Sequence, residues 1–339
     1  MKLRSLNRLL FLLCFNLLLI GPAFSQKKAS DNILKIMKEA YELYKADKSG
    51  KNADYIPYLA KVDPNLYGIT VVTAEGKVYE LGDTNFEFGI ESISKVFVLC
   101  LAMQSHTPED IMQKIGVNAT GFPFNSVTSI ELQGKKAVNP LVNAGAMATT
   151  SLVKAENGAA KWKKINDYFN KLAGREIKVI DELYQSEAET NQHNQAIAIL
   201  LQSYNAIYDN PLESCDIYTK QCSFGTTAKD LAMMAATLAN NGIQPISKER
   251  LIETDHIPKV LAVMATNGLY ETSGEWLYSI GLPAKSGVGG GIIAVAPGKM
   301  GIAVFAPPLD EAGNSVKAIK TIRYLSDKLQ LNLFKAAEH

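Results

Sequence analysis

The sequence predicts a mixed α/β (α+β) fold, in which an antiparallel sheet flanked by helices lies beside an all-helical lobe. An early pair of apolar strand patterns, Tyr67–Thr73 and Val78–Leu81, surrounds a Glu-Gly turn. A late pair, Gly291–Ala296 and Gly301–Ala306, surrounds a Pro-Gly turn. Between the two pairs, apolar residues recur at helical spacing. Because hairpins near both ends of a chain can share one sheet, the middle of the chain is left to form the helical lobe.

The length and composition agree with one domain made of two lobes. The chain has 339 residues, of which 47% are hydrophobic and 20% are charged, as in ordinary globular proteins. We expect residues 26–339 to form this domain, with an α/β lobe from about 26–90 and 270–339 and a helical lobe from about 91–269. Internal repeats and low-complexity tracts are absent from residues 26–339.

Helical periodicity accounts for most of the remaining chain. A capped amphipathic helix at Ser30–Ala46 and a terminal helix at Asn314–Leu329 should cover the sheet. The stretch 116–140 is rich in turn residues, and the polar residues 188–193 by themselves indicate a solvated loop. Further helices are expected at Pro108–Lys114, Asn143–Val153, Ala159–Leu172, Gln195–Ile207, Leu212–Gln221, Ala228–Ala239 and Pro258–Ala265.

Residues 1–25 have the pattern of a secretory signal peptide. A basic start precedes an apolar run, Leu9–Ile20, that is too short to span a bilayer comfortably. Ala23-Phe24-Ser25 then fits a small-x-small cleavage site before Gln26. We therefore expect an exported, periplasmic protein that is cleaved after Ser25, with an uncleaved anchor as the alternative.

The charge balance points to no polyanionic partner. Cleavage would remove Lys2, Arg4 and Arg8, which leaves 32 basic residues against 34 acidic ones and a formal charge of −2. Such a balance does not indicate binding to nucleic acid or to an anionic membrane. No segment after the signal is long and apolar enough to cross a membrane.

The cysteines and histidines predict neither a disulfide framework nor a metal site. Cleavage leaves an odd number of cysteines: Cys100, Cys215 and Cys222. On one helix, Cys215 and Cys222 would lie about 10 Å apart, which is beyond bridging distance. Since the histidines show no paired spacing with cysteines or carboxylates, we expect no metal and no other cofactor. These histidines are His106, His193, His256 and His339.

A serine followed three residues later by a lysine forms the central candidate pair. Ser92 and Lys95 begin an apolar run, and positions i and i+3 share one face of a helix. A serine hydroxyl needs a base, and a lysine amine can serve when burial or a nearby cation lowers its pKa. The amide of Ser92 at a helix start can also face an oxyanion. The structural alternative for Ser92 is a plain helix N-cap.

A second motif, Lys285-Ser286-Gly287-Val288, stands just before the late hairpin. A lysine, a hydroxyl and a glycine on a strand beside a Ser-x-x-Lys helix is the arrangement of the penicillin-recognising hydrolases. In that arrangement Lys285 can depress the pKa of Lys95, and Gly287 lets a substrate approach the backbone. The amide of Val288 can be a second oxyanion donor.

Other polar candidates are weaker by themselves. Glu187 and Asn194 flank the polar stretch described above. Tyrosine can relay a proton to a leaving amine, although most tyrosines are packing residues. The tyrosines considered are Tyr55, Tyr218 and Tyr270.

These residues fall in a series of blocks through which the chain resembles the serine-dependent glutaminase family, whose fold is β-lactamase-like. The resemblance covers essentially all of the chain after the signal, and the order of the blocks makes it specific. The blocks are Ala53–Pro57, Gly82–Thr84, Ser92–Lys95, Phe124–Ser126, Asn139–Ala146, Gln185–Glu187, Asn194, Tyr218, Gln221–Ser223, Met234–Ala239, Gly268–Tyr270, Gly281–Val288, Pro307–Asp310 and Asn314–Val316.

The resemblance implies an amidohydrolase that converts L-glutamine and water to L-glutamate and ammonia. It implies Ser92 as the nucleophile, Lys95 as its base and Tyr270 as an aid to proton transfer toward ammonia. The amides of Ser92 and Val288 would hold the oxyanion, supported by Lys285, Ser286 and Gly287. The implied substrate-binding residues are Tyr55, Ser92, Asn143, Glu187, Asn194, Tyr218, Tyr270 and Val288. A carboxylate suits the amino group of the substrate, and amide and phenol donors suit its carboxylate.

Two other functions stay open at this point. A penicillin-interacting serine hydrolase, either a β-lactamase or a D-Ala-D-Ala peptidase, shares both lysine motifs, but no clear Ser-Asp-Asn or Ser-x-Asn block follows Ser92. A glutamine-binding sensor would keep the pocket without turnover, and the intact Ser92, Lys95 and Tyr270 argue against it. The resemblance also implies a homodimer or homotetramer. Export is unusual in this family and suggests that the protein scavenges periplasmic glutamine.

Overall fold

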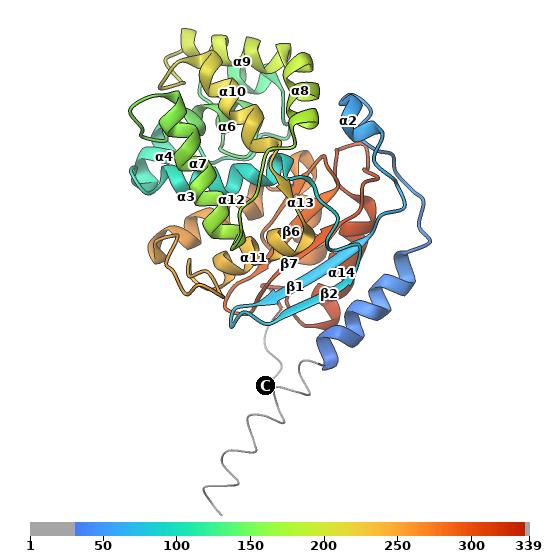
Figure 1. Ribbon diagram of the computed structural model, residues 1–339. Coiled ribbons are helices and arrows are strands. Elements are labelled where there is room, and N and C mark those ends of the chain that lie inside the picture. Colours follow the sequence, from blue (N-terminus) through green and yellow to red (C-terminus); the bar gives the residue numbers. More distant parts are fainter. Residues whose placement is uncertain (1–30, 336–339) are drawn as a thin grey trace, which may run out of the picture.

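The computed structural model describes residues 31–335, which fold into a five-stranded sheet with helices on both faces and a block of helices at one side (Figure 1). Adjacent strands are antiparallel, in the order β2-β1-β7-β6-β5. The strands are β1 (Gly68–Thr73), β2 (Val78–Gly82), β5 (Ala284–Gly287), β6 (Gly291–Ala296) and β7 (Met300–Phe305). Both expected hairpins are confirmed, and they join in one sheet because β1 pairs with β7 along its whole length.

The central strands send their side chains into two different hydrophobic cores. In β6, Ile292 and Ala294 lie in the core on one face of the sheet, whereas Ile293 and Val295 lie in the core on the other face. Successive side chains of a strand point to opposite faces. A strand that is covered on both faces therefore needs apolar side chains at successive positions, which is why the late strands are continuous apolar runs.

One face of the sheet carries the first and last helices, as expected. The helix at residues 31–44 and α14 (Val316–Lys328) contribute Met37 and Leu325 to the core on this face. They are joined there by α13 (Ser273–Ile280), a short helix that the sequence did not predict. In Figure 1, α14 and the first helix lie beyond the strands on the side away from the helical block.

The opposite face is covered by α11 (Ala228–Ala239), whose bounds agree with the prediction. A capping box between Thr227 and Asp230 begins this helix. The helix lies so close to β7 that a Cβ atom on Gly301 would lie 2.2 Å from the main-chain nitrogen of Ala236. The close packing of α11 on β7 therefore requires small residues in both elements.

The other helices form the block that stands beside the sheet in Figure 1, with the short helix α2 next to α8. They agree in most places with the predicted ranges. Their bounds are α2 (Pro57–Ala60), α3 (Ser94–Ala102), α4 (Pro108–Lys114), α5 (Val127–Leu132), α6 (Asn143–Ser151), α7 (Gly158–Ala173), α8 (Asp181–Thr190), α9 (Gln192–Ser203), α10 (Pro211–Cys222) and α12 (Ile257–Asn267). The described residues also contain three 3-10 turns: η1 (Glu91–Ile93), η2 (Thr254–His256) and η3 (Tyr270–Thr272).

Two local predictions are wrong. The polar stretch 188–193 is the end of α8 and the start of α9 rather than a loop, since Leu183 and Ile197 anchor the two helices in the core. The turn-rich stretch 116–140 contains α5, which begins at the N-cap Ser126. Two short strands, β3 (Phe88–Gly89) and β4 (Gly225–Thr226), also pair without a clear sequence signal.

The division of the chain into two lobes stays a prediction. Helix α11 comes from the part of the chain that was expected to form the helical lobe, but it packs on the sheet. The expected signal peptide lies outside the described residues. Within residues 31–335, no helix is both long enough and apolar enough to cross a membrane.

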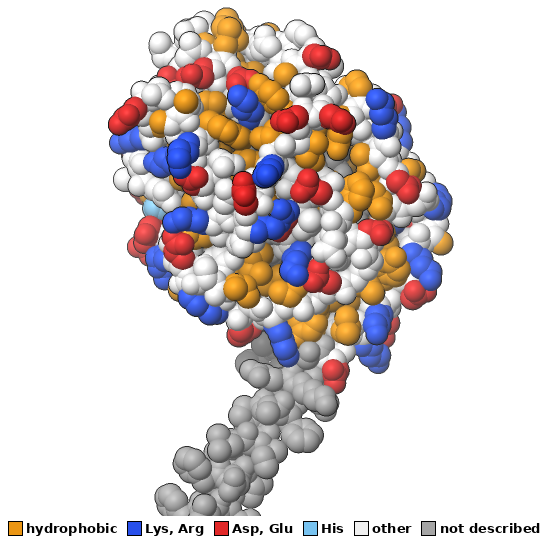
Figure 2. Space-filling view, in the orientation of Figure 1, with side chains coloured by type: hydrophobic (Ala, Val, Ile, Leu, Met, Phe, Trp, Pro, Cys, Tyr) orange, Lys and Arg blue, Asp and Glu red, His pale blue; other side chains and the backbone are white. Residues whose placement is uncertain are grey.

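Cys100, Cys215 and Cys222 are free and buried. The face seen in Figure 2 mixes acidic and basic side chains, in agreement with the nearly balanced charge.

The contact between α11 and β7 generates a stability prediction. We expect Gly301→Ala to lower the free energy of unfolding by about 2 kcal/mol, because its methyl group would overlap the backbone of α11. The control is Gly274→Ala in α13, where a Cβ atom meets nothing within 4 Å and where alanine favours the helix. Urea denaturation of both variants tests this, and equal effects of the two substitutions would contradict it.

Candidate active site

The segment that carries Ser92 is held between the sheet and the helical block. After β3 the chain enters η1 and then α3, in which every residue from Ser94 to Ala102 is buried. Ser92 therefore lies in a 3-10 turn directly before the α-helix rather than in its first turn. Its side chain is only 7% exposed.

Strand β5 runs directly against this segment. A Cβ atom on Gly287 would lie 2.9 Å from the carbonyl oxygen of Ile90, and one on Gly289 would lie 2.7 Å from that of Gly89. The glycine of the Lys-Ser-Gly motif is thus required by the close approach of the serine segment. This differs from the expectation that Gly287 makes room for a substrate.

Lys95 is enclosed in the first turn of α3. It is 1% exposed, and its Nζ donates a hydrogen bond of 2.7 Å to Oδ1 of Asn143. The rings of Phe124 and Tyr218 have their centroids 5.9 and 5.6 Å from Nζ. Burial lowers the pKa of Lys95 from 10.5 to about 8, against the opposing effect of nearby acidic groups. An amine with this pKa is partly neutral near neutral pH.

Lys285 and Tyr270 form the wall on the side of β5. Nζ of Lys285 lies 4.1 Å from the centroid of the Tyr270 ring and donates to the carbonyls of Gly268 and Ser286, at 2.9 and 2.7 Å. Burial and the charge of Lys95 hold the pKa of Lys285 well below its usual value. Burial itself, rather than Lys285, is the main cause of the lowered pKa of Lys95.

Tyr270 lies next to the serine in an unusual backbone conformation. Its φ angle is +56°, and its hydroxyl donates a hydrogen bond to the carbonyl of Ser286. Burial raises the pKa of Tyr270, so the phenol stays protonated and can donate. The ring of Phe124 packs against it with a centroid separation of 4.8 Å.

Hydrogen-bonded amide and phenol groups connect Lys95 to the helical block. Oδ1 of Asn143, the first residue of α6, accepts from Lys95 and also from the hydroxyl of Tyr218, at 3.0 Å. Nδ2 of Asn143 donates to Oδ1 of Asn194 on α9, at 3.0 Å. These bonds fix the orientation of the Asn143 amide and connect three helices to the amine of Lys95.

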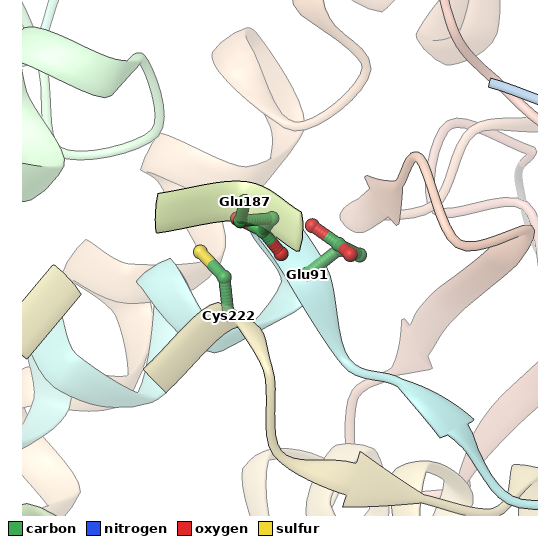
Figure 3. A group of neighbouring side chains, drawn as sticks. All are labelled: Glu91, Glu187 and Cys222. Atoms are coloured by element: carbon green, nitrogen blue, oxygen red, sulfur yellow. The ribbon is translucent and has the colours of Figure 1, made fainter. Parts of the chain in front are cut away.

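Glu187 of α8 forms an acidic cluster with Glu91 and Cys222. One candidate ligand atom from each of the three side chains lies within 4.8 Å of the other two, and Figure 3 shows their ends facing a common point. Glu91, the residue before Ser92, is 3% exposed and has a φ angle of +52°. Burial raises the pKa of Glu91 from 4.5 to about 7 and also raises that of Glu187.

A cavity of about 310 Å³ opens beside this cluster. Tyr55, Asn143, Glu187 and Asn194 line it, and Tyr55 is 56% exposed at its edge. Val288 shares a small hydrophobic cluster with Leu183 and with Ile56, which lines the cavity. The structure thus places four of the predicted substrate-binding residues around one volume. Ser92, Lys95, Tyr218, Tyr270 and Val288 are not among its lining residues, and the bond from Lys95 to Asn143 connects the two groups of side chains.

Sequence reasoning missed Glu91 as a member of the site. The available signal was a carboxylate within an otherwise apolar stretch, immediately before the proposed nucleophile. Phe124 and Cys222 stood within the recognised blocks, but their roles beside Lys95 and Glu187 depend on contacts between distant helices.

Comparisons with known proteins agree with this geometry. The family model for glutaminase matches residues 50–334. The glutaminase of Colwellia psychrerythraea is 55% identical over 302 residues, which cover 89% of this chain and 97% of the relative. Among solved structures, the probable glutaminase YbaS has a TM-score of 0.89 at 47% identity, with 90% of this chain and 99% of that chain covered.

A further solved structure is a covalent complex between the Bacillus subtilis glutaminase YbgJ and 5-oxo-L-norleucine, formed by reaction with 6-diazo-5-oxo-L-norleucine. Its TM-score is 0.78 at 30% identity, and the match covers 89% of this chain and 98% of that chain.

The raised pKa of Glu91 generates a prediction about stability. An acid whose folded-state pKa is raised stabilises the fold below its unfolded pKa, near 4.5, and that stability is lost as the pH rises toward about 7. We expect Glu91→Gln to gain stability over the wild type across this range, by about 2 to 3 kcal/mol at about pH 8.

Denaturation curves at several pH values provide the measurement. Glu189→Gln, which removes the same charge from an exposed position on α8, is the control and should alter stability equally at each pH. A difference between Glu91→Gln and wild type that does not change with pH would refute the prediction.

Proposed function

This chain belongs to the glutaminase family and hydrolyses L-glutamine to L-glutamate and ammonia, and we propose that it does so through a serine acyl-enzyme, with Ser92 as the nucleophile and Lys95 as its base. The observation that carries this mechanism is the burial of Lys95 one turn from Ser92, with its pKa lowered to about 8. The similarity to glutaminases favours this function over a penicillin-interacting hydrolase.

The cavity wall supplies complementary groups for a free amino acid. Glu187 would accept hydrogen bonds from the amino group of glutamine. Tyr55, Asn194 and Tyr218 would bind its carboxylate, since amide and phenol groups can donate to it. With both charged ends held, the side-chain amide would reach Ser92 in a restricted orientation, which lowers the entropic barrier.

The chemical steps follow from the groups around Ser92. Oγ of Ser92 attacks the side-chain amide carbon while its proton passes to Nζ of Lys95. The amides of Ser92 and Val288 stabilise the oxyanion, and Asn143 orients Lys95. Tyr270 aids transfer of a proton to the departing nitrogen, so ammonia leaves and an ester remains on Ser92. Water activated by the same base then releases glutamate.

A relative supports a covalent route. In YbgJ, a glutamine-like amino acid with a ketone near the position of the side-chain amide is bound covalently after reaction with its diazo precursor. The matching fold supports Oγ of Ser92 as the atom that would be modified in this chain.

Export and assembly complete the proposal. The pattern of residues 1–25 supports a cleaved signal peptide and a periplasmic enzyme that scavenges glutamine, and family membership supports a homodimer or homotetramer. A periplasmic form that begins at Gln26 is the expected product, and full-length protein in the cytosolic fraction would contradict export. Light scattering of the purified enzyme tests the assembly.

Replacement of the nucleophile is the direct test of the mechanism. We expect Ser92→Ala to reduce ammonia release from L-glutamine by about a thousandfold or more, since no other hydroxyl replaces Oγ. The control is Ser94→Ala two residues later, a serine outside the proposed machinery, which should keep most activity. L-Asparagine and a cephalosporin are assayed alongside, and cephalosporin cleavage without glutamine turnover would show that the substrate assignment is wrong.

The proposed base predicts a characteristic pH dependence. Below about pH 8 Lys95 is increasingly protonated and cannot accept the serine proton, so kcat should rise as the pH increases through this range. Lys95→Arg should be inactive at every pH, because a guanidinium stays charged. Lys61→Arg at an exposed site is the control. A wild-type kcat that falls over this range would exclude Lys95 as the base.

A further inference from the structure

Glu91 places a second carboxyl group beside Glu187, and no step described above uses it. The two side chains come from separate elements, η1 and α8, and Figure 3 shows that they point toward one another. Oε1 of Glu91 and Oε1 of Glu187 are both shielded from solvent and have no hydrogen-bond partner among the described residues. Two neighbouring buried carboxylate oxygens without a donor are unfavourable, so this pair needs a proton or a cation between its oxygen atoms.

The geometry makes simultaneous ionisation of both carboxyl groups unfavourable. Two carboxylates in a buried site repel each other, so one of the pair keeps a proton. The groups that face the pair from other elements are Lys95 of α3, Tyr218 and Cys222 of α10, Tyr55 before α2 and Tyr270 of η3. Lys95 is the cation among them. Burial raises the pKa values of Cys222, Tyr218 and Tyr270, and the pKa of Tyr55 at the exposed edge of the cavity is also raised, so these groups stay neutral near pH 7.

The same surroundings favour an ammonium group over a metal ion as the occupant. A metal site would use Cys222 as a thiolate, but burial and the nearby carboxylates keep its thiol protonated. The cavity lined by Glu187 also carries amide groups, which suit an organic ligand with several polar ends.

We propose that Glu91 and Glu187 act as one carboxyl pair, which shares a proton when the site is empty and releases it when the amino group of the substrate binds. Glu91 is then a positioning residue that acts through Glu187 and couples substrate binding to proton release. This inference rests on the proposed role of Glu187 as the partner of the amino group.

The sign of the pH effect follows from this coupling. Below about pH 7 the pair holds its proton, and an arriving cation must displace it, so binding weakens as the pH falls. Above that pH the proton is already lost, and both carboxylates attract the cation. Burial is the main cause of the raised pKa of Glu187, and Glu91 raises it further. Glu91→Gln therefore lowers the pKa of Glu187 without returning it to its usual value, and the new amide at position 91 can donate a hydrogen bond to the Glu187 carboxylate.

Binding of L-glutamine to the Ser92→Ala enzyme, measured by calorimetry, tests the proposal without turnover. Titrations in two buffers of different ionisation enthalpy count the protons released. We expect Ser92→Ala to release a substantial fraction of a proton below about pH 7, with an affinity that falls up to about tenfold per pH unit. Adding Glu91→Gln should reduce this release, because the contribution of Glu91 to the raised pKa of Glu187 is lost, whereas adding Glu189→Gln should not.

The comparison separates this inference from the function on which it rests. Glu91 and Glu187 both raise the pKa of Lys95, so the proteins are compared at about pH 6, where an amine with a pKa of about 8 is protonated. Two results would overturn the coupling. In one, the Ser92→Ala protein releases no proton when glutamine binds. In the other, the Ser92→Ala/Glu91→Gln protein releases as many protons as the Ser92→Ala protein. The Ser92→Ala/Glu187→Gln protein should bind glutamine poorly at every pH. If it binds as well as Ser92→Ala, the proposed role of Glu187 fails as well.

Discussion

The exclusion of water from the amine of Lys95 is the constraint on which the rest of the site depends. An exposed lysine is a cation at neutral pH and cannot accept a proton from a serine. Here a helix with no exposed residue carries the lysine into the interior, and Asn143 and two aromatic rings occupy its surroundings. The position of α3 between the sheet and the helical block provides this burial, so the chemistry of the site is a consequence of its place in the fold.

Burial of this kind has a cost in stability. Lys95, Lys285 and Glu91 are almost wholly removed from water, and Oε1 of Glu187 is shielded from solvent as well. Two residues beside Ser92, Glu91 and Tyr270, adopt positive φ angles, a conformation that costs about 1 kcal/mol or more for such side chains. Strand β5 lies in close contact with Ile90 and Glu91 at Gly287, and the carbonyl of Ser286 in the same strand accepts from Tyr270. Function is thus concentrated where the fold is locally least favourable.

The acidic pair shows why a site cannot be understood from its reactive groups alone. Ser92 and Lys95 are one turn apart in the sequence, but the electrostatic field around them comes from α8 and α10. Glu187 reaches Glu91 because a polar stretch that reads as a loop is the junction of two helices. The buried Leu183 and Ile197 override the local polarity and determine the position of that carboxylate.

From the sequence alone, the two hairpins, most helices and the helical segment that carries Ser92 and Lys95 could be predicted, because each depends on periodicity or on neighbours along the chain. Three features could not be predicted from the sequence: the close packing at Gly287, the bounds of α8, and the position of Glu91 beside Glu187. Each of these depends on which backbone or side chain arrives from a distant segment, and local patterns contain no information about that approach. The sequence by itself determined the chemical groups that are available, whereas the tertiary structure decided their protonation, because burial and neighbouring charge exist only after the helices pack together.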